Sequence, residues 1–150
     1  MNTIRHAARP ALLGCAGLAL SVLAAVLPFV GKNLLQAHIH AGYPTYSPEQ
    51  VANASFVWQT ILGIIGALAV TGWVITIIIV RRRARYARWV TTMLAAIGLA
   101  VSLATALIKD TSGAVGLAPV FGVLLMLPCI VGVFVGVSVW RSSMPAGIRG

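Results

Sequence analysis

The sequence predicts an all-α, polytopic membrane protein in which four transmembrane helices form one antiparallel bundle. Of the 150 residues, 59% are apolar and 9% are charged, whereas about 25% of the residues in a soluble domain are charged. The mean hydropathy is +0.96, so too few polar groups remain to cover a surface that faces water. The apolar residues also fall into four long runs, each near the roughly 20 residues that a bilayer-spanning helix requires.

The four predicted spans cover residues 10–30, 56–80, 89–108 and 117–140. The first run is longer than the apolar region of a secretory signal peptide, which has about 7 to 15 residues, so we interpret it as a retained span. The connections between the spans are short and polar. We therefore expect a single four-helix domain whose helices pack against one another within the membrane.

The longest connection, residues 31–55, is expected to be a loop on the outer side of the membrane, with a turn-rich part at residues 42–46. Its second half carries a start signal for a helix. Ser47 is suited to cap a helix, Pro48 to occupy the first helical position, and Gln50 to complete a capping box. The second helix is therefore expected to start near residue 48, before the apolar run begins.

The distribution of Lys and Arg predicts the orientation of the spans. Nine of the eleven basic residues lie on one side of the four spans, and such residues are concentrated in cytoplasmic segments. We therefore expect both termini and the basic turn at residues 81–88 to be cytoplasmic, and the protein to lie in the plasma (inner) membrane.

The basic turn is also the candidate site for contact with anionic lipids. Each basic residue near a membrane surface contributes about 1 kcal/mol of attraction to anionic headgroups. The residues concerned are Arg81, Arg82, Arg83, Arg85 and Arg88. Nucleic acid is not expected as a partner, because the positive charge is explained by membrane topology.

Small residues spaced four apart in every span predict how the helices pack, since small side chains let helix backbones approach closely in a membrane. In the first span these residues are Gly17, Ser21 and Ala25. In the other spans the predicted packing residues are Gly63, Ala67, Gly98, Ser102, Gly132 and Gly136, with Thr71 and Ala106 continuing two of the rows. Pro128 lies within the fourth span, where it removes a backbone hydrogen bond and is expected to bend the helix.

The candidates for a metal or proton-sensing site on the outer side are His38, His40, Glu49 and Asp110. Two imidazoles two residues apart point the same way in an extended chain and can chelate a metal, whereas on a helix they diverge by about 200°. Solvated or interfacial histidines are the favoured interpretation. We expect no metal and no other cofactor.

The spans contain no Asp, Glu, Lys, Arg or His. Ionisable residues within a membrane mark proton-coupled transport and similar functions, so a small multidrug or proton-coupled exporter is disfavoured. The sequence also offers no Ser/His/Asp set, no paired carboxylates, no Cys-x-x-Cys motif and no glycine-rich phosphate loop. We therefore expect no catalytic residues and no enzymatic activity.

Two functions remain open. The favoured one is a non-enzymatic accessory or envelope-associated factor that acts by helix packing and contact, with a membrane protein partner or as a homo-oligomer. The alternative is a small oligomeric channel or carrier lined by Thr60, Thr71, Thr76, Ser102 and Thr105. A pore requires that these hydroxyls share one wet face, whereas packing requires that they bond to carbonyls one turn earlier or to neighbouring helices.

Several short motifs resemble the small four-helix hypothetical membrane proteins of actinobacteria. These motifs are Tyr46-Ser47-Pro48-Glu49-Gln50-Val51, Gly72-Trp73, Tyr86-Ala87-Arg88-Trp89-Val90, Asp110-Thr111-Ser112-Gly113, Leu127-Pro128-Cys129 and Trp140-Arg141. The resemblance covers most of the chain beyond residue 40. It implies the four-helix architecture and a bacterial plasma membrane, and it brings no activity and no site residue with it.

Overall fold

A computed structural model describes residues 2–82, 84–109 and 117–142, with side chains from residue 12 to residue 141 of these ranges. The described residues form five helices and no strand: α1 (Asn2–Val30), α2 (Lys32–Gly42), α3 (Pro48–Arg81), α4 (Ala87–Leu107) and α5 (Pro119–Ser142). Four of them contain segments long and apolar enough to cross a bilayer, namely Leu12–Val30, Pro48–Arg81, Ala87–Leu107 and Pro119–Arg141. The prediction of four long apolar helices and no strand is confirmed for the described residues, and these helices suggest a membrane protein.

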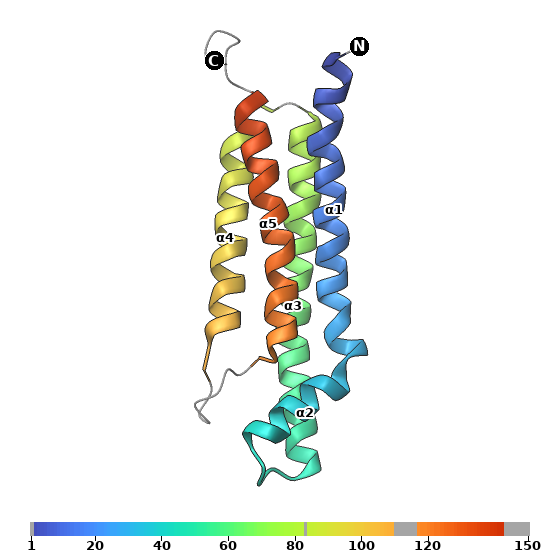
Figure 1. Cartoon of the computed structure of the whole chain (residues 1–150), viewed down its shortest axis with the longest axis vertical. Helices are drawn as coiled ribbons and strands as arrows, with labels where there is room; N and C mark the ends of the chain where they lie inside the picture. Colours follow the sequence, from blue (N-terminus) through green and yellow to red (C-terminus); the bar gives the residue numbers. More distant parts are fainter. Residues whose placement is uncertain (1, 83, 110–116, 143–150) are drawn as a thin grey trace.

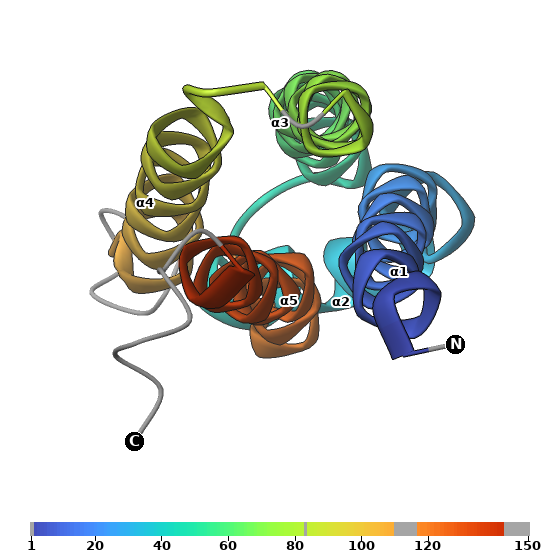
Figure 2. The ribbon, with the colours of Figure 1, turned by 90° about the horizontal axis from the view of Figure 1, so that it is seen from above.

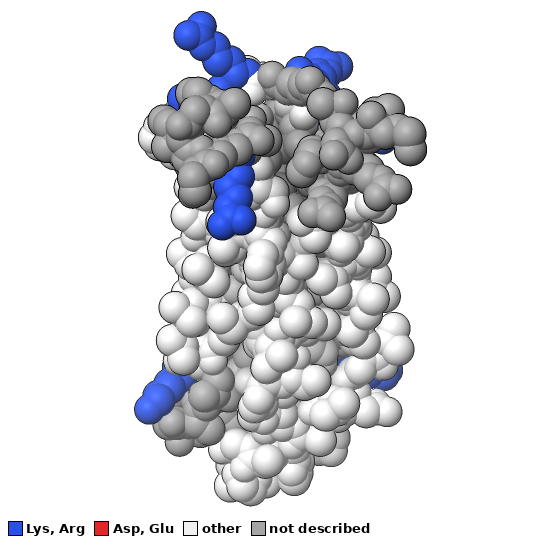
Figure 3. Space-filling view, turned by 45° about the horizontal axis from the view of Figure 1, so that its top comes forward, with Lys and Arg blue, Asp and Glu red and all other residues white. Residues whose placement is uncertain are grey.

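The four long helices lie side by side along one axis (Figure 1). The start of α1, the end of α3, the start of α4 and the end of α5 lie together at the top of Figure 1, which we call the arginine end. The short helix α2 lies across α3 at the opposite end, which we call the α2 end. Figure 3 shows Lys and Arg near both ends of one face and an uncharged band between them, as expected for a protein that spans a bilayer.

Seen along the long axis, the long helices follow the order α3, α1, α5, α4 around the bundle (Figure 2). Helix α1 packs extensively against α3 and α5, and α4 packs extensively against α5. In contrast, α3 and α4 contact each other sparsely although they are consecutive in the chain. The α3–α4 side is therefore the least tightly packed side of the bundle.

Helix α3 begins at the residue that the capping box predicts. The Ser47 hydroxyl accepts a hydrogen bond from the Gln50 backbone N–H at 3.3 Å, and the Gln50 side-chain oxygen accepts one from the Ser47 N–H at 2.8 Å. The helix has 34 residues and is therefore about 50 Å long at 1.5 Å per residue. Because a bilayer core is about 30 Å thick, α3 is longer than a single crossing of the core requires.

Residues 31–55 are not only a loop, because Lys32–Gly42 forms helix α2. Its side chains Leu35 and Ile39 are four residues apart, so they share one face, and both are buried. An isolated helix of 11 residues is marginal in water, which means that this packing stabilises α2. The expectation of a loop at residues 32–42 was wrong. Local polarity favours a loop there, whereas the contacts that stabilise α2 come from helices that are distant in the sequence.

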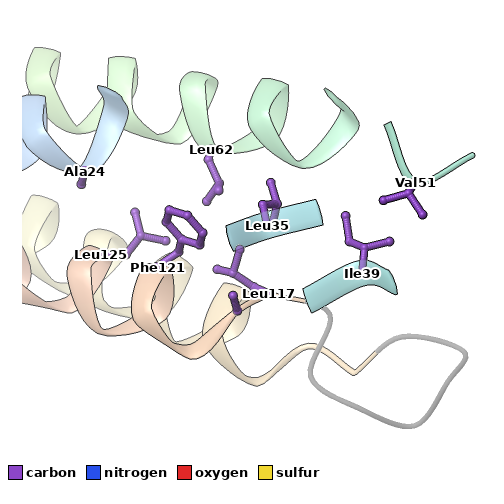
Figure 4. Packing of buried hydrophobic residues seen from close by; sticks show 9 residues of the cluster. Ala24, Leu35, Ile39, Val51, Leu62, Leu117, Phe121 and Leu125 are labelled. Atoms are coloured by element: carbon purple, nitrogen blue, oxygen red, sulfur yellow. The ribbon is translucent and has the colours of Figure 1, made fainter. Parts of the chain in front are cut away.

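The main hydrophobic core lies where α2 meets α1, α3 and the start of α5. Figure 4 shows Leu35 of α2 next to Leu62 of α3 and Phe121 of α5, and Ile39 of α2 next to Val51 of α3. The full cluster is Ala24, Leu35, Ile39, Val51, Leu62, Leu117, Ala118, Phe121 and Leu125. These side chains close the bundle at the α2 end.

Candidate functional site

The candidate metal residues do not form a metal site in the described part of the chain. His38 and His40 both lie on α2, so their side chains diverge around the helix instead of chelating one ion. Glu49 is exposed in the first turn of α3, and Asp110 lies outside the described residues. Among the residues that the structure describes, no group of three His, Cys, Asp or Glu side chains is placed to hold a metal ion.

The arginines of the basic turn fall into two environments. Arg81, Arg82 and Arg85 are exposed and are therefore available to headgroups or to a partner. Arg83 lies outside the described residues. Arg88 is half-buried, and its guanidinium carbon lies 5.2 Å from the centre of the Trp140 ring, within the range of a cation–π contact.

Arg88 belongs to a cluster that joins the start of α4 to the end of α5. The Trp140 indole N–H donates to the Thr92 hydroxyl at 3.1 Å, and that hydroxyl donates to the Arg88 carbonyl at 2.8 Å. The Trp89 and Trp140 rings also meet edge to face, with centroids 5.5 Å apart. Arg88 thus contributes to helix packing, unlike the three exposed arginines.

The predicted small residues of α4 and α5 lie mostly where these two helices meet. A Cβ added at Gly98 would be 3.6 Å from the Cys129 sulfur, and one at Gly132 would be 3.5 Å from the Ala95 Cβ. The Ser102 hydroxyl donates to the Leu125 carbonyl at 3.2 Å, one turn before Pro128. Gly136 differs, because a Cβ there would have no described heavy atom within 4 Å.

On α3 the predicted row of small residues follows the contact with α1 only in part. A Cβ added at Gly63 would lie 3.2 Å from the ring of Phe29 on α1, whereas Ala67 is exposed. The backbones of α1 and α3 approach closely at Gly66, which lies directly against Ala25. One residue along a helix corresponds to a rotation of about 100°, so choosing Ala67 in place of Gly66 selects the wrong face.

The hydroxyls that the pore alternative requires are divided between exposed positions, such as Thr60 and Thr71, and buried positions, such as Thr76 and Ser102. Thr60, Thr71 and Thr105 each donate to the carbonyl four residues earlier in the same helix, at 2.9, 2.9 and 2.7 Å. Ser102 bonds across to α5 instead, and Thr76 is buried. Three of the five hydroxyls therefore form a hydrogen bond within their own helix, and one forms a hydrogen bond to a neighbouring helix.

A cavity of about 190 Å³ lies among the four long helices. Buried residues of all four long helices line it, including Ser21 of α1, Trp73 of α3 and Pro128 of α5. The exposed residues that line it, Leu68, Ile97 and Val101, belong to α3 and α4. The cavity therefore opens sideways, between the two neighbouring helices that contact each other least.

Two hydroxyls in the cavity wall lack a partner among the described residues. Ser21 is 1% exposed and Thr91 is 2% exposed, and neither side-chain oxygen has a hydrogen bond. In contrast, five other hydroxyls bond to the carbonyl four residues earlier: those of Thr60, Thr71, Thr92, Thr105 and Ser138. Ser55 of α3, which does not line the cavity, is a third buried hydroxyl without a partner among the described residues.

The aromatic wall of the cavity is Trp73, whose ring lies directly against Gly17 of α1 and 3.9 Å from a Cβ added at Gly132 of α5. The spacing of residues in the sequence does not predict this site. Ser21 and Gly17 indicate only close helix packing, and Thr91 belongs to no predicted row. A large aromatic residue within a span, facing glycines in two other spans, is a signal that could have located the centre of the bundle.

No protein-family model matches the chain, and no curated protein and no solved structure is significantly similar to it.

Proposed function

We propose that the protein is a non-enzymatic integral membrane protein that acts by contact with other membrane components, as an accessory or envelope-associated factor. In this proposal the four long helices cross a plasma membrane as an antiparallel bundle, with both termini and the basic turn in the cytoplasm. The excess of basic residues on one side supports this orientation, with nine against two.

The observation that carries the proposal is the use of the intramembrane hydroxyls. Thr60, Thr71 and Thr105 bond within their own helices and Ser102 bonds to α5, as expected for packing and not for a wet pore. The core cluster around Leu35 also fills the α2 end of the bundle, which favours a closed bundle over a channel within one chain.

The outer surface of the bundle offers two kinds of contact. Large apolar side chains are exposed on each long helix, for example Val26 on α1, Ile64 on α3, Ile97 on α4 and Phe134 on α5. At the arginine end, Arg81, Arg82 and Arg85 are exposed and are suited to anionic headgroups. A partner helix and the lipid surface are therefore both proposed as contacts.

The proposal can be tested by purifying the tagged chain from its native membrane in a mild detergent, with an unrelated tagged four-helix membrane protein as the control. We expect a membrane protein to co-elute at a constant ratio with this chain and not with the control. The purified chain in liposomes should conduct neither K⁺ nor protons above the level of empty liposomes. Elution of the chain without a partner, together with ion flux that rises with the protein-to-lipid ratio, would instead support the channel alternative.

A further inference from the structure

We propose that one anionic phospholipid binds on the α3–α4 side of the bundle, with its headgroup on the exposed arginines of the basic turn and part of one acyl chain in the cavity among the long helices. The proposal rests on the lipid contact proposed above and makes it specific. The two parts of the site share one side of the bundle, because the basic turn joins α3 to α4 (Figure 2) and the cavity opens between the same two helices.

The charge of the basic turn determines the charge of the ligand. Arg81, Arg82 and Arg85 are exposed. Of the two acidic residues in the chain, Glu49 lies in the first turn of α3, at the α2 end, and Asp110 is the third residue after α4 in the sequence. No described carboxylate therefore neutralises the three guanidinium groups. A phosphate complements them, because arginine binds phosphate through paired, charge-assisted hydrogen bonds.

The depth of the cavity places it within reach of an acyl chain from the leaflet at the arginine end. Each leaflet contributes about 15 Å to a bilayer core that is about 30 Å thick. Thr76 of the cavity wall lies about 8 Å along α3 from Arg81, at 1.5 Å per residue. Ile97, at the cavity opening, lies about 14 Å along α4 from Arg88. A lipid whose headgroup lies at the basic turn can therefore place its chain in the cavity without leaving its leaflet.

The lining and size of the cavity suit a segment of an acyl chain. Its opening is formed by Leu68, Ile97 and Val101, all exposed and all within segments apolar enough to span a bilayer. An apolar cavity of about 150 Å³ in another protein binds benzene, which has six carbons. The cavity here measures about 190 Å³ and accommodates about eight carbons on the same scale. The arginines above the opening favour a phospholipid over an uncharged hydrocarbon as the occupant.

The test measures contact between acyl chains and Trp73, which lines the cavity and is 9% exposed. The other three tryptophans, Trp58, Trp89 and Trp140, are replaced by Phe, which keeps an aromatic ring at each position, and thermal unfolding verifies that this single-tryptophan protein is folded. It is placed in phosphatidylcholine nanodiscs with a small, equal fraction of phosphatidylglycerol or phosphatidylcholine that carries brominated acyl chains, which quench indole fluorescence on contact.

We expect brominated phosphatidylglycerol to quench Trp73 with an apparent affinity about fivefold higher than that of brominated phosphatidylcholine, the factor that one basic residue near a headgroup contributes. Spin-labelled lipids with the same two headgroups provide a second measurement on the chain with all its tryptophans. The fraction of motionally restricted label should be larger for phosphatidylglycerol.

Variants of the basic turn test the headgroup site. With Arg81→Gln, Arg82→Gln and Arg85→Gln combined, we expect the two brominated lipids to quench equally, at the level of phosphatidylcholine before the substitutions. The matched control combines Lys32→Gln and Lys109→Gln, since these residues are also exposed but lie outside the basic turn. The control should keep the preference for phosphatidylglycerol.

A variant of the cavity tests the chain site. A Cβ added at Gly72 would be 3.9 Å from the Leu94 side chain, which is an ordinary contact, so a larger side chain fits into the cavity there. We expect Gly72→Leu to lower quenching of Trp73 by both lipids, because the leucine occupies the space of the acyl chain. Ala67→Leu should leave quenching unchanged, since Ala67 is exposed and does not line the cavity.

Three outcomes would overturn the proposal: equal quenching by the two lipids before the arginines are replaced, a preference for phosphatidylglycerol that persists after they are replaced, or quenching that Gly72→Leu leaves unchanged. All three are measured on the purified chain in nanodiscs, whereas the contact function is tested by co-elution with a partner and by ion flux. A chain that co-elutes with a partner but shows no lipid preference would refute this lipid site and leave the contact function standing.

Discussion

Gly66 allows α1 and α3 to approach more closely than any larger residue would permit. A Cβ added at this position would lie 2.8 Å from the Ala25 Cα, which is backbone and cannot move aside as a flexible side chain can. Gly136 also lies within an apolar helix, but a Cβ there would meet no described heavy atom within 4 Å. Glycine is thus required by a close helix contact at Gly66, whereas at Gly136 there is space for a larger side chain.

This contrast predicts opposite effects for one substitution at two sites. We expect Gly66→Ala to lower the free energy of unfolding by about 1–3 kcal/mol, because overpacking forces the helix backbones apart. Gly136→Ala should be neutral or stabilising by up to about 1 kcal/mol, since alanine is the better helix former. Thermal unfolding in a mild detergent measures both, and equal destabilisation by the two variants would contradict the predicted contact between α1 and α3.

At the scale of helices, the features that the sequence could predict are those set by neighbouring residues. The start of α3 follows from Ser47, Pro48 and Gln50, which satisfy its first backbone groups without help from the rest of the fold. Helix α2 could not be predicted in this way, because its stability comes from Leu35 and Ile39 against other helices. The contact face of α3 could not be predicted for a similar reason: Gly66 lies against Ala25 of α1 and Ala67 is exposed, a difference that is set by the neighbouring helix and not by the local pattern.

The role of α2 predicts that two adjacent leucines respond differently to the same change. Leu35 is 0% exposed in the core cluster, whereas Leu34 is 60% exposed. Leu35→Ala should destabilise the protein by about 2–5 kcal/mol, the cost of removing a buried leucine side chain. Leu34→Ala should change stability by less than about 0.5 kcal/mol.

Unfolding of these two variants in nanodiscs is the measurement, and limited proteolysis of residues 31–47 provides a second one. Cleavage in this segment should increase in Leu35→Ala and remain unchanged in Leu34→Ala. If both variants behave like the parent, α2 does not stabilise the bundle through its apolar face.

On the scale of the whole molecule, composition predicts the membrane and the number of spans, but it does not predict the cavity. The cavity needs residues from four helices, including Ser21, Trp73, Thr91 and Pro128, and no spacing along the chain indicates that these residues meet. It exists because α3 packs mainly against α1 and α4 mainly against α5. Which helices pack against each other is decided only when the bundle assembles, and it cannot be inferred from the sequence of one helix.

The distribution of charge over the whole molecule predicts its orientation. Nine basic residues lie on the side of the termini and the basic turn, and two, Lys32 and Lys109, lie on the other side. Single cysteines can report this orientation in a background in which Cys15 and Cys129, both free thiols, are replaced by Ala. Thr45→Cys and Arg85→Cys are suitable reporters, because both positions are exposed and they lie in different connections.

We expect a membrane-impermeant thiol reagent to label Thr45→Cys in intact cells and to label Arg85→Cys only after the cells are permeabilised. The loss of Arg85 leaves eight basic residues against two, so the reporter itself should not reverse the orientation that the basic residues favour. Labelling at both positions after permeabilisation serves as the control for accessibility. Labelling of Arg85→Cys in intact cells, without labelling of Thr45→Cys, would mean that the termini face outward and that local packing overrides the charge distribution in setting the topology.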